Sequence, residues 1–72
     1  MLWNYEGMTI EGRYLGDIPV RGYVTLSRVK YGGGVSHHII LDKGFKDGNI
    51  SREAGEGIIL DHELVDRVLD TI

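Results

Sequence analysis

The sequence predicts a small, mainly β fold, and three observations carry that prediction. The 72 residues include 11 glycines and one proline, and the glycines separate short apolar segments as turns separate strands. Residues 8–15 and 35–41 alternate between apolar and polar side chains, the pattern of a strand with one buried side. A helical pattern occurs at the C-terminus alone. We therefore expect a single small domain over residues 1–72, α+β at most, built on a bent antiparallel sheet of four to five strands.

The first two strands are expected to form a hairpin. Gly16–Asp17 separates them, and glycine adopts the positive φ that a two-residue turn requires. In the second strand, the apolar residues of segment 18–26 share one phase, whereas Val29 and Tyr31 fall in the opposite phase. A β-bulge or sharp bend near Ser27–Arg28 would keep both sets on the inner side.

The rest of the predicted sheet follows from two more apolar runs. Residues 35–41 form the third strand, which three glycines, Gly32–Gly34, connect to the second. Residues 43–57 are rich in charge and glycine and are expected to be a loop with a tight turn at Lys46–Asn49. Residues 58–60 form the fourth strand.

The last segment has two interpretations. Its apolar residues recur at helical spacing and Asp61 is a suitable N-cap, which favours a short C-terminal helix that closes the sheet. The alternative is one helical turn at residues 61–64 followed by a last strand, the arrangement of an SH3-like partial barrel. That alternative places Asp70 on the side of the apolar residues, which argues against it. The apolar residues concerned are Leu64, Val65, Val68, Leu69 and Ile72.

The length of the chain indicates self-association. A domain of this size buries only about 60% of the surface that its unfolded chain exposes. Because the chain has no cysteine, neither disulfides nor a thiolate metal site can add stability. We therefore expect a homo-oligomer.

The N-terminus indicates a cytoplasmic protein. Residues 1–6 have neither the basic region nor the apolar region of a signal peptide, and no segment approaches the roughly 20 apolar residues of a membrane span. We expect no association with a membrane.

Charge is distributed unevenly along the chain. The formal net charge of −3 argues against binding of duplex DNA, which requires a basic face. Residues 18–41 nevertheless contain no carboxylate and carry Arg21, Arg28 and Lys30, whereas residues 53–72 hold six carboxylates against one arginine. The two halves either neutralise each other within one fold, meet between subunits, or leave an anion site in the middle of the chain.

Catalytic and metal-binding motifs are missing from the sequence. No phosphate-binding P-loop or dinucleotide fingerprint occurs, and the serines lie in no nucleophile-elbow context. Adjacent residues of a strand point to opposite faces, so His37 and His38 cannot ligate one metal from a regular strand. We expect no enzymatic activity, no metal and no cofactor.

The segment SRVKYGGGVSHH, residues 27–38, is the candidate site. Cationic side chains neutralise phosphate, glycines expose backbone amides to an anion, and an aromatic ring stacks on a base. The competing interpretation is a flexible hairpin tip without a ligand. The candidate ligand-binding residues are Arg28, Lys30, Tyr31, Gly32, Gly33, Gly34, Ser36 and His38.

Two classes of function fit these observations. The first is a non-catalytic binding module that captures an anionic ligand, a nucleotide signal or a short stretch of RNA, at loop 28–38. The second is a small accessory or inhibitory protein, of the kind that viruses and bacteria encode, which docks on a larger protein partner. An exposed strand or the acidic C-terminal segment would make that contact.

Overall fold

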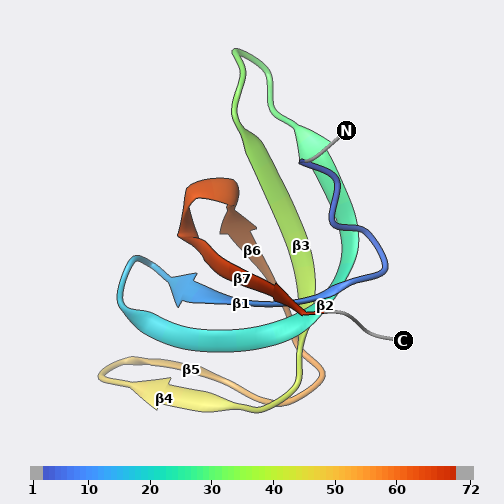
Figure 1. Ribbon diagram of the computed structural model, residues 1–72. Helices are drawn as coiled ribbons and strands as arrows, with labels where there is room; N and C mark the ends of the chain where they lie inside the picture. Colours follow the sequence, from blue (N-terminus) through green and yellow to red (C-terminus); the bar gives the residue numbers. More distant parts are fainter. Residues whose placement is uncertain (1–2, 70–72) are drawn as a thin grey trace.

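The computed structural model of the chain describes residues 3–69 and is mainly β (Figure 1). Seven strands and one short 3₁₀ turn follow one another along this part of the chain. They are β1 (Thr9–Tyr14), β2 (Ile18–Val29), β3 (Val35–Leu41), β4 (Phe45–Asp47), β5 (Ile50–Arg52), β6 (Gly57–Asp61), η1 (His62–Leu64) and β7 (Val65–Leu69).

Five of these strands form one antiparallel sheet in the order β6-β3-β2-β1-β7, and β4 and β5 form a separate hairpin. The predicted antiparallel sheet is therefore confirmed. Its edge strands β6 and β7 do not pair with each other, so the described strands form no closed barrel, and the SH3-like barrel is not supported.

The core lies on one side of the sheet and follows from alternation along the strands. In β2, buried residues alternate with exposed ones from Ile18 to Val24. In β3, His37, Ile39 and Leu41 face inward, as the pattern predicted. The buried apolar residues are Ile10, Ile18, Val20, Val24, Ile39, Leu41, Ile58 and Leu60.

A bulge bends β2, as predicted, but it lies earlier in the strand. The register against β3 shifts between Val24 and Leu26. This shift turns Ser27 into the buried layer and leaves Leu26 on the exposed side. Val29 and Tyr31 are also exposed, so the prediction that the bulge would bury them is wrong. Both lie toward the hairpin tip, beyond the last buried apolar residue of β2.

Residues 43–57 were expected to be a loop, and they contain the hairpin β4–β5. Asp47 pairs with Ile50, so the connection is the two-residue turn Gly48–Asn49, within the predicted tight turn. Strands of three residues are too short to produce a recognisable period. The Phe45 ring packs against Tyr14, with ring centroids 5.9 Å apart.

The predicted C-terminal helix is wrong. A single 3₁₀ turn, His62–Leu64, leads into β7, so the alternative of one turn and a last strand describes this segment. A helix of this length is only marginally stable by itself. Pairing with β1 instead gives the backbone groups of this segment hydrogen-bond partners. Asp61 makes no side-chain cap. Ile72 and Asp70, which entered the helix prediction, lie outside the described residues.

Residues 3–69 contain no helix that is long and apolar enough to span a bilayer.

Candidate functional site

The glycine-rich loop forms the tip of the β2–β3 hairpin and stands clear of the rest of the fold (Figure 1). The Lys30 amide donates to the Gly34 carbonyl at 2.9 Å, and the Gly33 amide donates to the Lys30 carbonyl at 3.0 Å. Gly32, Gly33 and Gly34 have φ values of +89°, +98° and +81°. Three successive left-handed residues explain the three glycines, because side chains are strained in that region. The turn therefore accounts for the glycines without a ligand.

Five of the eight predicted site residues converge on one small hollow beside this loop. Its volume is about 340 Å³, within the lower range of small-ligand pockets. The register places Arg28 beside Ser36 and Ser36 beside Asp61, so β2, β3 and β6 all contribute. The predicted residues on its wall are Arg28, Lys30, Tyr31, Ser36 and His38, and the further ones are Ile59 and Asp61.

The two cations of this hollow differ in their partners. The Lys30 ammonium lies 3.1 Å from Asp61 Oδ1, and both side chains are about half exposed. Arg28 is exposed and forms no ion pair with any residue of segment 3–69. An anion at this site would meet a free guanidinium and would compete with Asp61 for Lys30.

Access to the remaining predicted residues is uneven. Tyr31 is fully exposed and His38 is half-buried. Ser36 is buried, so its hydroxyl can contribute only at the floor of the hollow. Gly32, Gly33 and Gly34 do not line the hollow and lie at the tip above it.

A second and larger hollow, of about 970 Å³, lies beside strands β1, β2 and β7 and the β3–β4 connection. Its cations come from four separate segments of the chain, so no local stretch of the sequence indicates that they lie together. Phe45, Pro19 and Val20 supply apolar wall. The charged residues are Glu11, Arg13, Arg21, Asp42, Lys43, Asp66 and Arg67.

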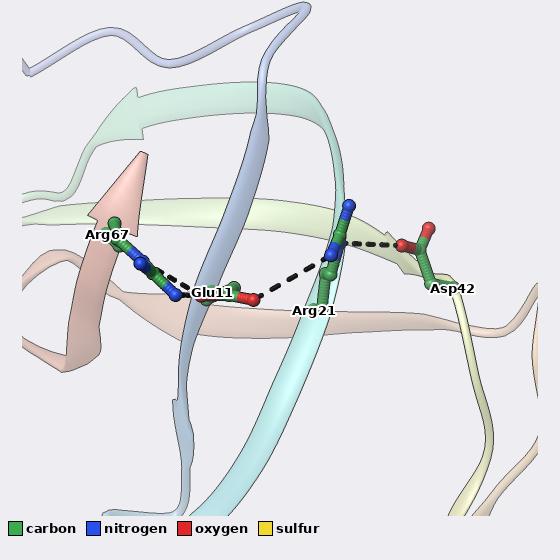
Figure 2. A network of polar contacts seen from close by, with 4 residues as sticks. All are labelled: Glu11, Arg21, Asp42 and Arg67. Carbon is green, nitrogen blue, oxygen red and sulfur yellow. Dashed lines mark hydrogen bonds and ion pairs between the residues drawn. The ribbon is translucent and has the colours of Figure 1, made fainter. Parts of the chain in front are cut away.

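Most of the cations that line this larger hollow form ion pairs with carboxylates. Figure 2 shows Glu11 between Arg67 and Arg21, with Asp42 on the far side of Arg21. Arg21 Nε lies 3.1 Å from Asp42 Oδ2, and its guanidinium lies 3.8 Å from Glu11 Oε2. Because carboxylates hold the arginines in this way, the network stabilises the sheet more readily than it attracts an anion.

A third cluster, Ser27, His37 and His62 with the Tyr5 ring, lies at the inner side of the sheet. Ser27 Oγ is 2.7 Å from His37 Nδ1, and His37 Nε2 is 2.9 Å from His62 Nδ1. Tyr5 stacks on both imidazoles, with ring centroids 4.8 Å from His37 and 5.2 Å from His62. Burial of His37, and secondarily the nearby His62, lowers the pKa of His37 below its ordinary value.

This serine and histidine pair does not form an accessible nucleophile. Ser27 is 5% exposed and His37 is 0% exposed, and neither residue lines one of the two hollows. Ser27 Oγ also accepts the Tyr5 amide at 3.1 Å. The hydroxyl is thus engaged inside the fold, where a substrate carbonyl cannot reach it.

His37 and His38 point to opposite sides of β3, as predicted: His37 lies in the buried layer and His38 lines the small hollow. Within the part of the chain that the structure describes, no three histidine or acidic side chains are grouped in a way that could hold a metal ion.

Comparison with known proteins returns no match. No protein-family model fits the chain, and no curated protein or solved structure is significantly similar to it. The interpretation of the site therefore rests on its geometry.

Proposed function

We propose that this protein is a non-catalytic binding module for a phosphate-bearing ligand, a nucleotide or a short single-stranded RNA, captured at loop 28–38. The observation that carries the proposal is the position of Arg28. It is an exposed cation without an ion-pair partner in segment 3–69, and it lies on the wall of a hollow that also holds Lys30 and Tyr31.

Each group has a distinct role in this proposal. The planar Arg28 guanidinium donates two parallel hydrogen bonds to phosphate oxygens, and Lys30 adds a point charge. The amides of Gly32 and Gly34 have no hydrogen-bond partner among the described residues and are available as further donors. The exposed Tyr31 ring stacks on a base.

Calorimetric titration tests the proposal. Mono-, di- and cyclic nucleotides and short RNA oligomers are titrated into the wild type, Arg28→Ala and the double variant with Lys30→Ala, at two salt concentrations. We expect binding that weakens with salt and that is lost in the double variant. Lys46→Ala is the matched control, because Lys46 is an exposed cation of β4 outside both hollows.

Two outcomes would contradict this function. One is the absence of heat with every ligand. The other is binding that survives the double substitution. If nucleotides bind and RNA does not, or the reverse, the ligand class is resolved within the same proposal.

A protein-docking module is the second candidate function. It is favoured by strand β6, which lies at the edge of the sheet with Ile59 exposed. The acidic C-terminal segment supports docking less well, because Asp61 and Asp66 already pair with Lys30 and Arg13.

A further inference from the structure

Strand β6 is an edge strand whose residues 57–60 lack the usual protection against pairing. Natural edge strands carry charges, prolines or bulges that keep other strands away. Residues 57–60 of β6, Gly-Ile-Ile-Leu, have no charge and no proline, and their pairing with β3 runs without a register shift. Ile59 is 54% exposed. This edge therefore offers a regular, apolar template for another strand.

The backbone groups at the free edge follow from the ladder. The Leu41 amide donates to the Glu56 carbonyl at 3.0 Å and the Leu41 carbonyl accepts from the Gly55 amide at 2.9 Å, so both backbone groups of Leu41 point toward the strand β6 side. Bonded pairs alternate along an antiparallel ladder. In the register of β3 and β6, the backbone groups of Ile58 and Leu60 are therefore the ones that hydrogen-bond to β3. The amides and carbonyls of Gly57, Ile59 and Asp61 then point away from the sheet.

We propose that β6 pairs in antiparallel orientation with β6 of a second copy of this chain, with Ile59 opposite Ile59. In this register Gly57 lies opposite Asp61 of the second copy. The three residues with free backbone groups thus face one another and satisfy both edges at once. The contact is isologous and has the two-fold symmetry of most protein dimers.

Side chains on the outer face fit this register. Leu26, His38 and Ile59 form a row of neighbouring side chains across β2, β3 and β6. In the proposed dimer, the rows of the two copies meet at Ile59, beside the two-fold axis. Directly opposite aliphatic side chains stabilise an antiparallel pair. Gly57 has no side chain, so it leaves room for Asp61 of the second copy and its ion pair with Lys30.

Charge also favours a second copy in antiparallel orientation. The residue before β6 is Glu56, whereas Lys30 pairs with Asp61 at the other end of the strand. Antiparallel pairing brings Glu56 of one copy to the end of β6 that carries Lys30 in the other. Parallel pairing would place Glu56 beside Glu56, which is unfavourable. The edge is therefore complementary to itself in one orientation.

A charge-exchange experiment tests this dimer. Ile59→Lys and Ile59→Glu are each examined by analytical ultracentrifugation at micromolar concentration, with the wild type as reference. Each variant places two like charges opposite each other, so we expect the dimer to dissociate about tenfold more readily or more. Mixing the two variants places Lys opposite Glu and should restore a one-to-one heterodimer. Circular dichroism confirms that each variant is folded, since Ile59 is exposed.

Val68→Lys is the matched control, because Val68 is an exposed aliphatic residue, at 38%, on the opposite edge strand β7. The dimer should persist in this variant. Three outcomes would overturn the proposal. The first is a wild type that sediments as a monomer. The second is dissociation by Val68→Lys as well as by Ile59→Lys, which would indicate pairing of β6 with β7, and the third is a mixture of Ile59→Lys and Ile59→Glu that forms no heterodimer. Ile59 also lines the small hollow, so sedimentation is measured on protein without added ligand, and its outcome is then independent of phosphate binding at Arg28 and Lys30.

Discussion

Nε2 of the buried His37 lies 2.9 Å from Nδ1 of His62, so one imidazole donates to the other. Nδ1 of His37 lies 2.7 Å from Ser27 Oγ, which also accepts the Tyr5 amide. Both ring nitrogens of His37 are thus hydrogen-bonded inside the fold. The contact between the two rings holds a single proton, because two fully protonated imidazoles would place N–H groups face to face.

The first prediction concerns the pH dependence of stability. Burial lowers the pKa of His37 in the folded state, so the unfolded chain binds a proton at a higher pH than the folded one. The free energy of unfolding should be constant above about pH 6.5, the ordinary histidine value, and should decrease as the pH falls below it. Thermal unfolding between neutral and mildly acid pH measures this change.

His62→Gln is the informative variant for that prediction. The glutamine amide can still hydrogen-bond with His37 Nε2 but carries no charge, so the pH dependence should become weaker and should not disappear, since burial is the larger cause. A wild type whose melting temperature does not fall in this range would show that the buried imidazole is not held neutral.

The second prediction concerns Gly12 in β1. A Cβ at this position would lie closer to the Leu64 carbonyl and to the Leu60 side chain than real Cβ atoms approach. Gly12→Ala should therefore reduce the free energy of unfolding by about 1 to 3 kcal/mol through overpacking. Urea denaturation measures it, with Gly57→Ala as control, where a Cβ meets only ordinary contacts. Both substitutions are introduced into the Ile59→Lys variant, so that dimerisation does not contribute to the measured free energy of unfolding. Equal stability of the two would contradict the close approach of η1 to β1.

The third prediction concerns Glu11, which joins Arg67 on β7 to Arg21 on β2 (Figure 2). Glu11→Gln leaves both arginines without this partner and should cost about 1 kcal/mol at low salt, with a smaller effect at high salt. Glu63→Gln is the control, since Glu63 forms no ion pair within segment 3–69. If both variants unfold at the same urea concentration, the network contributes nothing measurable.

The fourth prediction separates binding from folding at Tyr31. This side chain is fully exposed, so Tyr31→Ala should change stability by less than about 0.5 kcal/mol. Loss of base stacking should weaken nucleotide or RNA binding by about tenfold. Tyr23→Ala, an exposed tyrosine of β2 outside both hollows, should leave the affinity unchanged. Equal affinities of wild type and Tyr31→Ala would remove the ring from the site.

The sequence predicted those strands whose side chains alternate over five or more residues. Segments 8–15 and 35–41 correspond closely to β1 and β3. It did not reveal β7, because Leu64 to Leu69 also fits a helical period, and the pairing with β1 that decides the matter joins residues more than 50 positions apart. Long-range pairing of this kind leaves no local signal.

The candidate site was predictable where it is continuous in sequence. Arg28, Lys30 and Tyr31 are close neighbours in the chain, and their approach to one hollow follows from the hairpin. Ile59 and Asp61 could not be assigned to it, since their position depends on the register of β3 against β6. The Ser27, His37 and His62 cluster was missed for a similar reason: the bulge in β2 is what turns Ser27 inward.

Site mapping by nuclear magnetic resonance tests the proposed function most directly. Nucleotides and short RNA are titrated into the ¹⁵N-labelled protein, and the backbone amide shifts are followed by residue. Capture of phosphate at loop 28–38 predicts that the largest changes occur at Arg28 and at Gly32 to Gly34, and that they shrink with added salt. Changes confined to the larger hollow at Arg13, Arg21 and Arg67, or no changes with any ligand, would contradict it.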